Sequence, residues 1–478
     1  MNFQFPHFSA ALPEIFLLSM TCLVLLTELF MKYSRSVVYV LSQVALLGTA
    51  ILFILGFNNI SYTTFNGHLI FDALGSLLGI FICIIACIAF IYAKHYTRDR
   101  NIPNEYYILG LFSTLGMLVM VTAQSFLMIY LGLELLSLPL YAMVALQKDS
   151  PTATEAAMKY FVMGAIASGM LLYGLSLLYG VSGSLNLPAV ASAITTMPEK
   201  QHLVLVFALV FVIAGLGFKL AAAPFHMWAP DVYTGAPTAV TAFLASAPKI
   251  AALGMAFRLL ITALPQIVSQ WHELLIILSV LSITIGNVIA IAQSNLKRML
   301  AYSAIAHIGY MLLGLLSGNA QGYSAALFYI LVYSIMSVGG FGMIVLLSRR
   351  GFEAENIEDF KGLNSRNPWL AFMMMLLMLS MAGVPPTVGF FAKLLVLKAV
   401  VQTQMVWLAV FAVLLAIVGA FYYLRVIKTM YFDAPGDPTP IACASDTRLM
   451  ISINSLALLV LGIFPGALLE VCRVAFGL

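Results

Sequence analysis

Long apolar segments follow one another along nearly the whole chain, and this pattern restricts the possible folds more than any other feature. Each segment has about 20 residues, the length that an α-helix needs to cross a bilayer. Only 9% of the 478 residues are charged, against roughly 25% in soluble domains. A helix satisfies its own backbone hydrogen bonds and can therefore lie in lipid. We expect an all-α polytopic membrane protein, with a single integral membrane domain over residues 1–478.

These segments predict fourteen membrane spans. The spans lie near residues 11–31, 37–57, 71–93, 106–123, 125–147, 157–180, 203–224, 238–263, 273–293, 299–317, 323–348, 368–402, 405–427 and 449–470. Pro385 and Pro386 interrupt the twelfth span, and the seventh is expected to continue past Pro224. Because proline removes a backbone donor and breaks a helix interior, spans 7 and 12 are predicted to be discontinuous.

Lysine and arginine are distributed unevenly between the loops. The odd-numbered loops, including the one assigned Lys297 and Arg298, hold fifteen of the 23 basic residues. The even-numbered loops and both tails hold only Lys200 and Arg473. Because basic residues accumulate in cytoplasmic loops, both termini are expected on the outer, positive side of the membrane. The net charge of +4 therefore concerns membrane topology, and we expect no nucleic acid partner.

The two interrupted spans suggest an internal repeat. Lys219 of the seventh span and Lys393 of the twelfth are separated by nearly the same number of residues as the starts of spans 4 and 9. This spacing predicts two five-helix repeats, at residues 106–265 and 273–430. Because five is an odd number, the second copy must be inverted in the membrane, as in many transporters. The alternative is a chance coincidence of two proline-containing helices.

Four ionisable side chains stand out among those within the predicted spans: Glu134, Lys219, Lys249 and Lys393. A charged side chain at the bilayer centre costs about 2.5–3.5 kcal/mol on insertion scales, so each is a candidate functional residue. The alternative for Glu134 is a neutral, hydrogen-bonded core acid. The alternative for each lysine is an amine that extends along the helix to the membrane surface.

These residue types fit proton transfer. An amine in a site of low dielectric constant can release and regain its proton when a neighbouring charge moves. Glu134 and Lys219 are the predicted switch pair, Lys249 is the middle station, and Lys393 is the exit or the next station.

Three further residues are accessory candidates. His307 lies in the tenth span, which corresponds to the span of Glu134 in the other repeat, and imidazole titrates near neutral pH. A hydrogen-bonded core histidine is the alternative for His307 and for His226, which follows the break at Pro224. Lys159 follows Glu155 by four residues, so a surface ion pair competes with a role in proton uptake.

Three stretches carry a resemblance to a known family: KLAAAPFHMWAPDVYTGAPT, QSNLKRMLAYSAIAHIGY and LSMAGVPPTVGFFAKLLVLKA. They resemble the signatures of the antiporter-like membrane subunits of respiratory complex I, a superfamily that includes Mrp-type sodium/proton antiporters and membrane-bound hydrogenases. The resemblance covers essentially the whole chain and is densest from about residue 105 to residue 430. Lysine at position 393 is typical of one branch of this family, because another branch has glutamate there.

The resemblance implies a proton-translocating subunit of an NADH–quinone oxidoreductase. In this family the residues that match Glu134, Lys219, Lys249 and Lys393 form a hydrated axis at mid-membrane. NADH, FMN, iron–sulfur clusters and quinone are bound by other subunits, so the chain is expected to hold no cofactor. Its expected partners are the lipid bilayer, protons and neighbouring membrane subunits, especially antiporter-like ones. The alternatives are a subunit of a Na⁺/H⁺ antiporter or membrane-bound hydrogenase, and a scaffold that only holds neighbouring subunits together.

Overall fold

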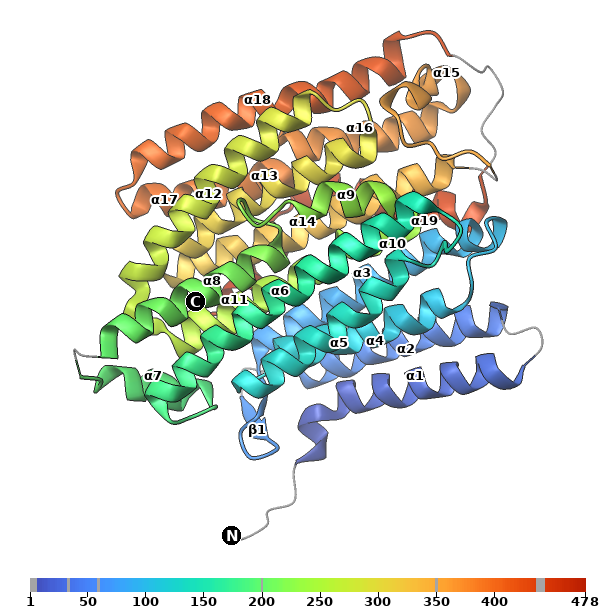
Figure 1. Cartoon of the computed structure of the whole chain (residues 1–478). Coiled ribbons are helices and arrows are strands. Elements are labelled where there is room, and N and C mark those ends of the chain that lie inside the picture. The colour runs from blue at the N-terminus through green and yellow to red at the C-terminus, as the bar shows by residue number, and fades with distance from the viewer. Residues whose placement is uncertain (1–6, 32–34, 58–60, 199–200, 349–350, 436–442) are drawn as a thin grey trace.

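Long helices that run roughly side by side make up most of the chain (Figure 1). The computed structural model describes residues 7–31, 35–57, 61–198, 201–348, 351–435 and 443–478. The long helices are α1 (Leu12–Phe30), α2 (Arg35–Gly56), α3 (Ala73–Asp99), α4 (Glu105–Val121), α5 (Phe126–Val144), α6 (Pro151–Ser182), α8 (His202–Leu220), α12 (Val268–Ile291), α13 (Leu296–Leu316), α14 (Ala320–Leu347), α18 (Val406–Phe432) and α19 (Ser445–Ile463).

Shorter elements complete the described structure. The shorter helices are α7 (Leu187–Thr195), α9 (Trp228–Gly235), α10 (Thr238–Leu244), α11 (Ala247–Ala256), α15 (Leu363–Arg366), α16 (Pro368–Ala382), α17 (Val388–Gln402) and α20 (Gly466–Val474). A π-helix (Phe257–Ala263) continues α11, and single 3₁₀ turns span Phe8–Ala11, Pro265–Ile267 and Ile357–Phe360. Strands β1 (Tyr62–Thr64) and β2 (Leu69–Phe71) pair antiparallel, with Thr63 opposite Ile70.

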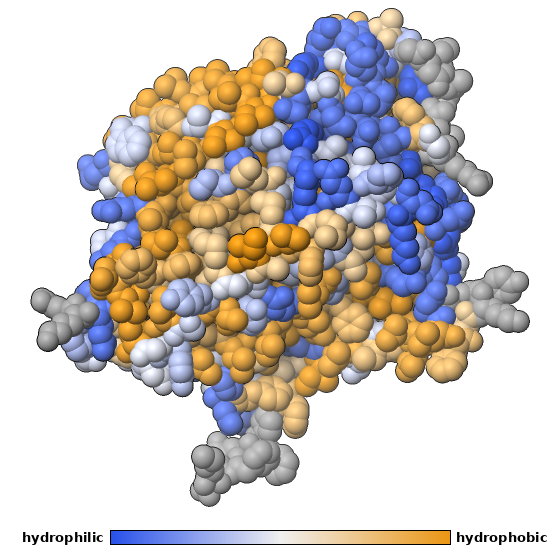
Figure 2. Space-filling model, viewed as in Figure 1, coloured by the Kyte–Doolittle hydropathy of each residue, from blue (hydrophilic) through white to orange (hydrophobic). Residues whose placement is uncertain are grey.

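The all-α polytopic fold class is confirmed. Within the described residues, twelve helices are long and apolar enough to cross a membrane, and α4 and α16 are shorter apolar helices. Together these fourteen segments lie where the fourteen spans were predicted. Figure 2 shows hydrophobic residues over much of the visible face, with hydrophilic residues gathered at the end that carries α15 in Figure 1.

Three spans are discontinuous, whereas the sequence predicted two. The seventh span consists of α8 and α9, and the twelfth of α16 and α17, as expected. The eighth span was predicted as one helix over 238–263. It is instead divided between α10 and α11 at Ala245 and Ser246, and its last turn is a π-helix. π-helical turns inside α-helices often occur at functional sites.

The centre of the bundle is formed by the eighth, tenth and eleventh spans. The most apolar windows of the eighth span, α13 and α14 are 100%, 94% and 89% buried, whereas those of α1, α6 and α18 are 33%, 28% and 33% buried. The last three therefore offer most of their surface to lipid or to partner subunits. Because α10, α11 and α13 lie at the centre, side chains on these helices are shielded from lipid by protein.

Glycine allows two of the helices to approach closely. A Cβ added at Gly116 of α4 would lie 2.3 Å from the backbone nitrogen of Leu136 in α5, and one added at Gly132 would lie 2.7 Å from the nitrogen of Met120. Small residues commonly permit such close packing of membrane helices. The approach fixes α5, which carries Glu134, against α4.

Candidate functional site: buried amines at two helix breaks

Two membrane helices end inside the bundle. Helix α8 ends at Leu220, and Ala221 then adopts a left-handed conformation with φ of 60°. Helix α16 ends at Ala382, and Gly383 follows with φ of 84°. A helix end leaves its last carbonyls without partners in the helix, and in lipid these need another donor. Both breaks therefore place unsatisfied carbonyl oxygens inside the protein.

Part of this need is met by nearby backbone and indole groups. At the end of α8, the nitrogen of Ala222 donates to Gly217, and the Trp228 indole donates to Phe218. At the end of α16, the nitrogen of Val384 donates to Leu379. The last two carbonyls of each helix remain for other donors.

A lysine amine binds these last two carbonyls at each break. Lys249 Nζ donates to the carbonyl of Leu220 at 2.9 Å and to that of Lys219 at 3.4 Å. Lys393 Nζ donates to the carbonyl of Ala382 at 2.7 Å and to that of Met381 at 3.1 Å. A cation is stabilised at a helix C-terminus because the carbonyl dipoles point towards it.

Each amine also lies near an aromatic face. Lys249 Nζ is 5.2 Å from the centre of the Trp228 ring, and Lys393 Nζ is 5.2 Å from that of Tyr310. Cation–π contacts at this distance favour the charged amine. Lys249 is 1% exposed, and Lys393 is half-buried.

Lys219 is buried in the last turn of α8 and points towards α5. Its Nζ donates to the hydroxyl of Ser137 at 2.7 Å, and that hydroxyl donates to the carbonyl of Leu133. The positive charges of Lys219 and Lys249 repel each other, because the Lys249 amine lies against the backbone of Lys219. This repulsion disfavours the state in which both amines are charged.

Glu134 lies one turn before Ser137 on α5. Its carboxylate accepts a hydrogen bond from the hydroxyl of Ser168 on α6 and attracts the Lys219 charge. Within the described residues, however, the Glu134 carboxylate and the Lys219 amine form no direct ion pair. The predicted switch pair is thus brought into one cluster, with Ser137 as the group that contacts the amine.

His307 lies in a second cluster with tyrosines. Its Nδ1 is 2.7 Å from the hydroxyl of Tyr329, and its Nε2 is 3.1 Å from that of Tyr423. The Tyr423 hydroxyl also hydrogen-bonds to Ser303. The Lys393 charge is near enough to act on the imidazole. Both ring nitrogens have partners, which suits a structural histidine and a proton-transferring one equally.

The other two accessory candidates lie outside these clusters. Lys159 is partly exposed and forms ion pairs with Glu155 and Asp231, each at 2.8 Å, and Asp231 also binds Arg298 at 2.8 Å. His226 is half-buried next to the break in the seventh span, and its Nδ1 has no partner among the described residues. The structure therefore places Lys159 in a surface network.

Several buried charges were not identified from the sequence. Lys297 was assigned to a loop, but it lies in the first turn of α13, is 2% exposed and donates to the carbonyl of Ala236 at 2.9 Å. Glu14 of α1 is 6% exposed and accepts a hydrogen bond from Thr122 at 2.9 Å. The available signal was a charge inside the first predicted span for Glu14, and a charge immediately beside the tenth for Lys297.

A buried ion pair fastens the π-helix to the start of α3. Arg258 donates to both oxygens of Asp72, at 2.7 and 2.8 Å, and is 4% exposed. Burial acts to raise the pKa of Asp72, but the Arg258 guanidinium outweighs it and holds this pKa below its usual range. The pair is bidentate, the geometry in which arginine binds carboxylate best.

The bundle with interrupted spans and buried amines defines an antiporter-like membrane subunit. Residues 123–419, more than half of the chain, match the family described as NADH:quinone oxidoreductase/Mrp antiporter, transmembrane, and the chain belongs to that family. Within it, the chain belongs with subunit N of NADH-quinone oxidoreductase. The protein of that name from Thioalkalivibrio sulfidiphilus is 56% identical to it, over 98% of each chain. The one from Coxiella burnetii is 54% identical, over 100% of each chain.

A solved structure of respiratory complex I contains a chain with the same fold. A chain of respiratory complex I from Thermus thermophilus with bound aureothin superposes with a TM-score of 0.83 at 31% identity. The match covers 96% of this chain and 98% of that one.

Proposed function

We propose that Glu134, Lys219, Lys249, His307 and Lys393 form the proton relay of a membrane subunit of NADH-quinone oxidoreductase. The observation that supports it most is the pair of amines, Lys249 and Lys393, held on the open carbonyls of two helix breaks. Full-length relatives of more than 50% identity carry the subunit N name, and this favours the oxidoreductase over an antiporter or a hydrogenase.

The mechanism that we propose uses repulsion between neighbouring amines. A charge that arrives near Glu134 changes the stability of the charged Lys219 amine, which Ser137 holds by one hydrogen bond. Lys219 then gives its proton towards Lys249, where two carbonyls and the Trp228 face accept a cation. From there the proton moves to the cluster of His307 and Lys393.

Energy for this cycle must come from outside the chain. Moving one charge outward against the membrane potential costs about 2.3 kcal/mol per 100 mV. In the mechanism proposed, the oxidation of NADH and reduction of quinone occur in other subunits, which also hold the flavin and the iron–sulfur clusters. Neighbouring antiporter-like subunits transmit the change in charge to Glu134.

The orientation and the repeats are part of the same proposal. Both termini are placed on the periplasmic side of a bacterial inner membrane, because the basic residues favour the opposite side. The inverted repeats at residues 106–265 and 273–430 are supported by the positions of the two breaks, because each break lies in the fourth span of its repeat. Lys219 lies before the break in the seventh span, whereas Lys393 lies after the break in the twelfth. The two amines that bind the carbonyls of a helix end are therefore Lys249 and Lys393.

The experiment that tests the relay compares variants of the whole complex in inverted membrane vesicles. Lys219→Ala should lower NADH-driven proton uptake, whereas Lys398→Ala, an exposed lysine on α17, should leave it unchanged. Wild-type proton uptake and NADH oxidation in Lys219→Ala would contradict the proposal. Sodium-dependent proton movement in vesicles without NADH would favour an antiporter instead.

A further inference from the structure

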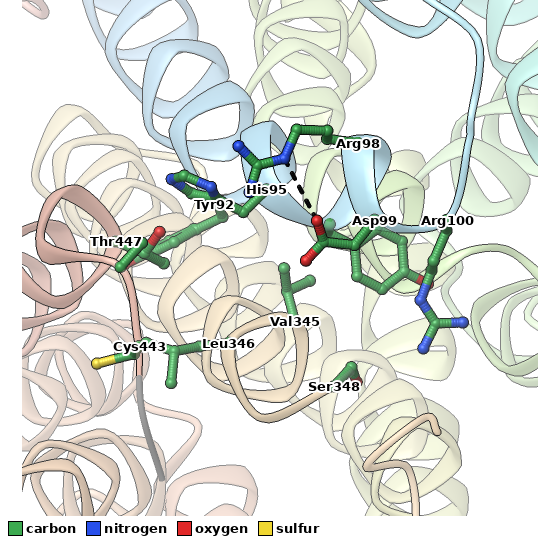
Figure 3. A pocket seen from close by; sticks show the side chains of 12 residues that line it. Tyr92, His95, Arg98, Asp99, Arg100, Val345, Leu346, Ser348, Cys443 and Thr447 are labelled. Atoms are coloured by element: carbon green, nitrogen blue, oxygen red, sulfur yellow. Dashed lines mark hydrogen bonds and ion pairs between the residues drawn. The ribbon is translucent and has the colours of Figure 1, made fainter. Parts of the chain in front are cut away.

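A polar cavity opens at one end of the bundle, between the last turns of α3 and α14 and the first turn of α19 (Figure 3). Its volume is about 280 Å³, and its lining includes Tyr96, Arg98, Arg100 and Cys443. By the distribution of basic residues, this end faces the cytoplasm. The cavity is large enough for several water molecules.

Two residues of the cavity wall bind Glu353, which lies in the segment after α14. Arg100 forms an ion pair with the Glu353 carboxylate at 2.6 Å, and the Tyr96 hydroxyl donates to it at 3.0 and 3.1 Å. Glu353 is partly exposed, with about a fifth of its side chain accessible to solvent. The carboxylate does not itself line the cavity; it lies behind the wall, bound to Arg100 and Tyr96, which do.

Glu353 also binds the first residue of α10. The Thr238 hydroxyl donates to the carboxylate, and the Thr238 backbone nitrogen donates to the Tyr96 hydroxyl at 3.1 Å. Thr238 is completely buried. The carboxylate thus connects the cavity to a helix that lies wholly inside the protein.

Helix α10 leads from Thr238 towards Lys249. Thr241 lies one turn further along the same face and is also completely buried. Lys249 lies eleven residues after Thr238, a distance of about 16 Å at the helical rise. Within this interval the chain crosses the break between α10 and α11.

Serine hydroxyls surround that break. Ser337 and Ser334 of α14 donate to the carbonyls of Ala245 and Ser246, at 3.2 and 3.3 Å. The backbone nitrogen of Lys249 donates to the same carbonyl of Ser246 at 3.1 Å. Hydroxyl groups therefore reach the first turn of the helix that carries Lys249.

A buried hydroxyl beside α10 marks a place for water. The Tyr233 hydroxyl is buried and has no protein partner among the described residues, although the Tyr233 carbonyl accepts from Thr241 at 3.0 Å. Buried polar groups without protein partners are commonly satisfied by internal water. Hydroxyls both donate and accept, so hydroxyls and water together can pass a proton.

The charges near the cavity wall explain why a carboxylate is needed behind it. Arg100 lies at the cavity, and the buried Lys297 amine attracts Glu353 from α13. Two cations at this position repel an incoming proton. The Glu353 carboxylate offsets them and presents an acceptor at the start of the hydroxyl series.

We propose that Glu353 and Thr238 form the cytoplasmic proton entrance of this chain, which takes protons from the polar cavity and delivers them along α10 to Lys249. The proton passes from cavity water to Glu353, and then through hydroxyls and water to the Lys249 amine. This inference rests on the relay proposed above, because Lys249 is its acceptor.

The test uses the whole complex in inverted vesicles, which expose this face to the medium. Glu353→Gln and Thr238→Val should lower the number of protons taken up per NADH oxidised. They should leave the rate of NADH oxidation in the presence of an uncoupler unchanged. Glu353→Asp and Thr238→Ser should retain uptake, because they keep the carboxylate and the hydroxyl. Glu358→Gln is the matched control, since Glu358 lies in the same segment and is mostly exposed.

Two results would overturn the entrance. One is wild-type uptake in both Glu353→Gln and Thr238→Val. The other is a loss of both proton uptake and uncoupled NADH oxidation, to the same extent, in all four variants of Glu353 and Thr238. That result would mean that the two residues have only a structural role. Lys249→Ala, measured in parallel, separates the two proposals: if it also takes up protons as wild type does, the relay itself is wrong.

A second measurement uses Cys443 in the cavity wall. A cationic, membrane-impermeant methanethiosulfonate reagent added to inverted vesicles should modify Cys443 and slow proton uptake, and Cys443→Ser should abolish this inhibition. Unmodified Cys443, or full modification without any loss of uptake, would contradict an aqueous entrance at this cavity.

Discussion

The hydroxyl of Ser137 provides a sharp test of how Lys219 is held. It accepts a hydrogen bond from the Lys219 amine at 2.7 Å, while its own proton is donated to the carbonyl of Leu133. Ser137→Ala removes this acceptor and one oxygen atom, and alanine is an excellent helix former. The helix is therefore expected to remain intact, and the change is confined to the amine.

The size of the effect follows from the charge of the donor. A hydrogen bond to a charged group contributes about 1.5–3 kcal/mol. Because 1.36 kcal/mol corresponds to a factor of ten, the loss amounts to about 10-fold to 150-fold in the equilibrium between charged and neutral Lys219. A relay that depends on this equilibrium should run more slowly by a corresponding factor at the Lys219 step.

The assay is NADH-driven proton uptake by inverted vesicles, with NADH oxidation followed in the same sample. Ser137→Ala should lower the rate of uptake, and Ser137→Thr, which retains a hydroxyl, should restore much of it. Ser176→Ala is a matched control, because Ser176 is an exposed serine of α6 that binds only its own helix. Wild-type uptake in Ser137→Ala would refute the argument that this hydroxyl sets the state of Lys219.

Two further predictions concern the scaffold around the relay. Asp72→Asn should lower the stability of the complex in detergent by about 3–5 kcal/mol, because Arg258 is left buried without its carboxylate. Asp99→Asn, which removes one member of an exposed ion pair, should lower this stability by less than about 1 kcal/mol. Because the pKa of Asp72 is lowered, the stabilisation by the Asp72–Arg258 ion pair is fully present above the usual pKa of an aspartate and is lost as pH falls through the lowered pKa. Thermal unfolding measured over a series of acidic pH values would show this loss. Gly116→Ala should push α4 away from α5, destabilise the folded chain by about 1–3 kcal/mol and so lower the yield of intact complex. Gly169→Ala should leave this yield unchanged, because the added methyl group meets open space.

The spans and two of the breaks could be predicted because they depend on local properties of the chain. Apolar length determines which segments cross the membrane, and Pro224, Pro385 and Pro386 cannot continue a helix. The third break was missed, since the run around Ser246 is as apolar as its neighbours. Its signal was Pro248, which suits the first turn of a new helix and so marks the start of α11.

The buried amines could also be identified from the sequence, because a lysine inside an apolar segment is energetically costly and therefore marks a candidate functional residue. Their partners could not be identified in this way. Ser137 is 82 residues from Lys219, and the carbonyls that bind Lys249 belong to another helix. Hydropathy does not distinguish a hydroxyl that faces an amine from one that bonds to its own helix. Lys297 is predicted in a loop, because hydropathy does not show that its helix begins at Leu296, before the apolar part of the segment.

The measurement that tests the central claim most directly is the number of protons taken up per NADH oxidised, in vesicles that carry Lys249→Ala, Lys393→Ala or Lys398→Ala. If amines bound to the open carbonyls of the two breaks carry the protons, the first two variants take up fewer and the third matches the wild type. Equal ratios in all three variants would contradict the account.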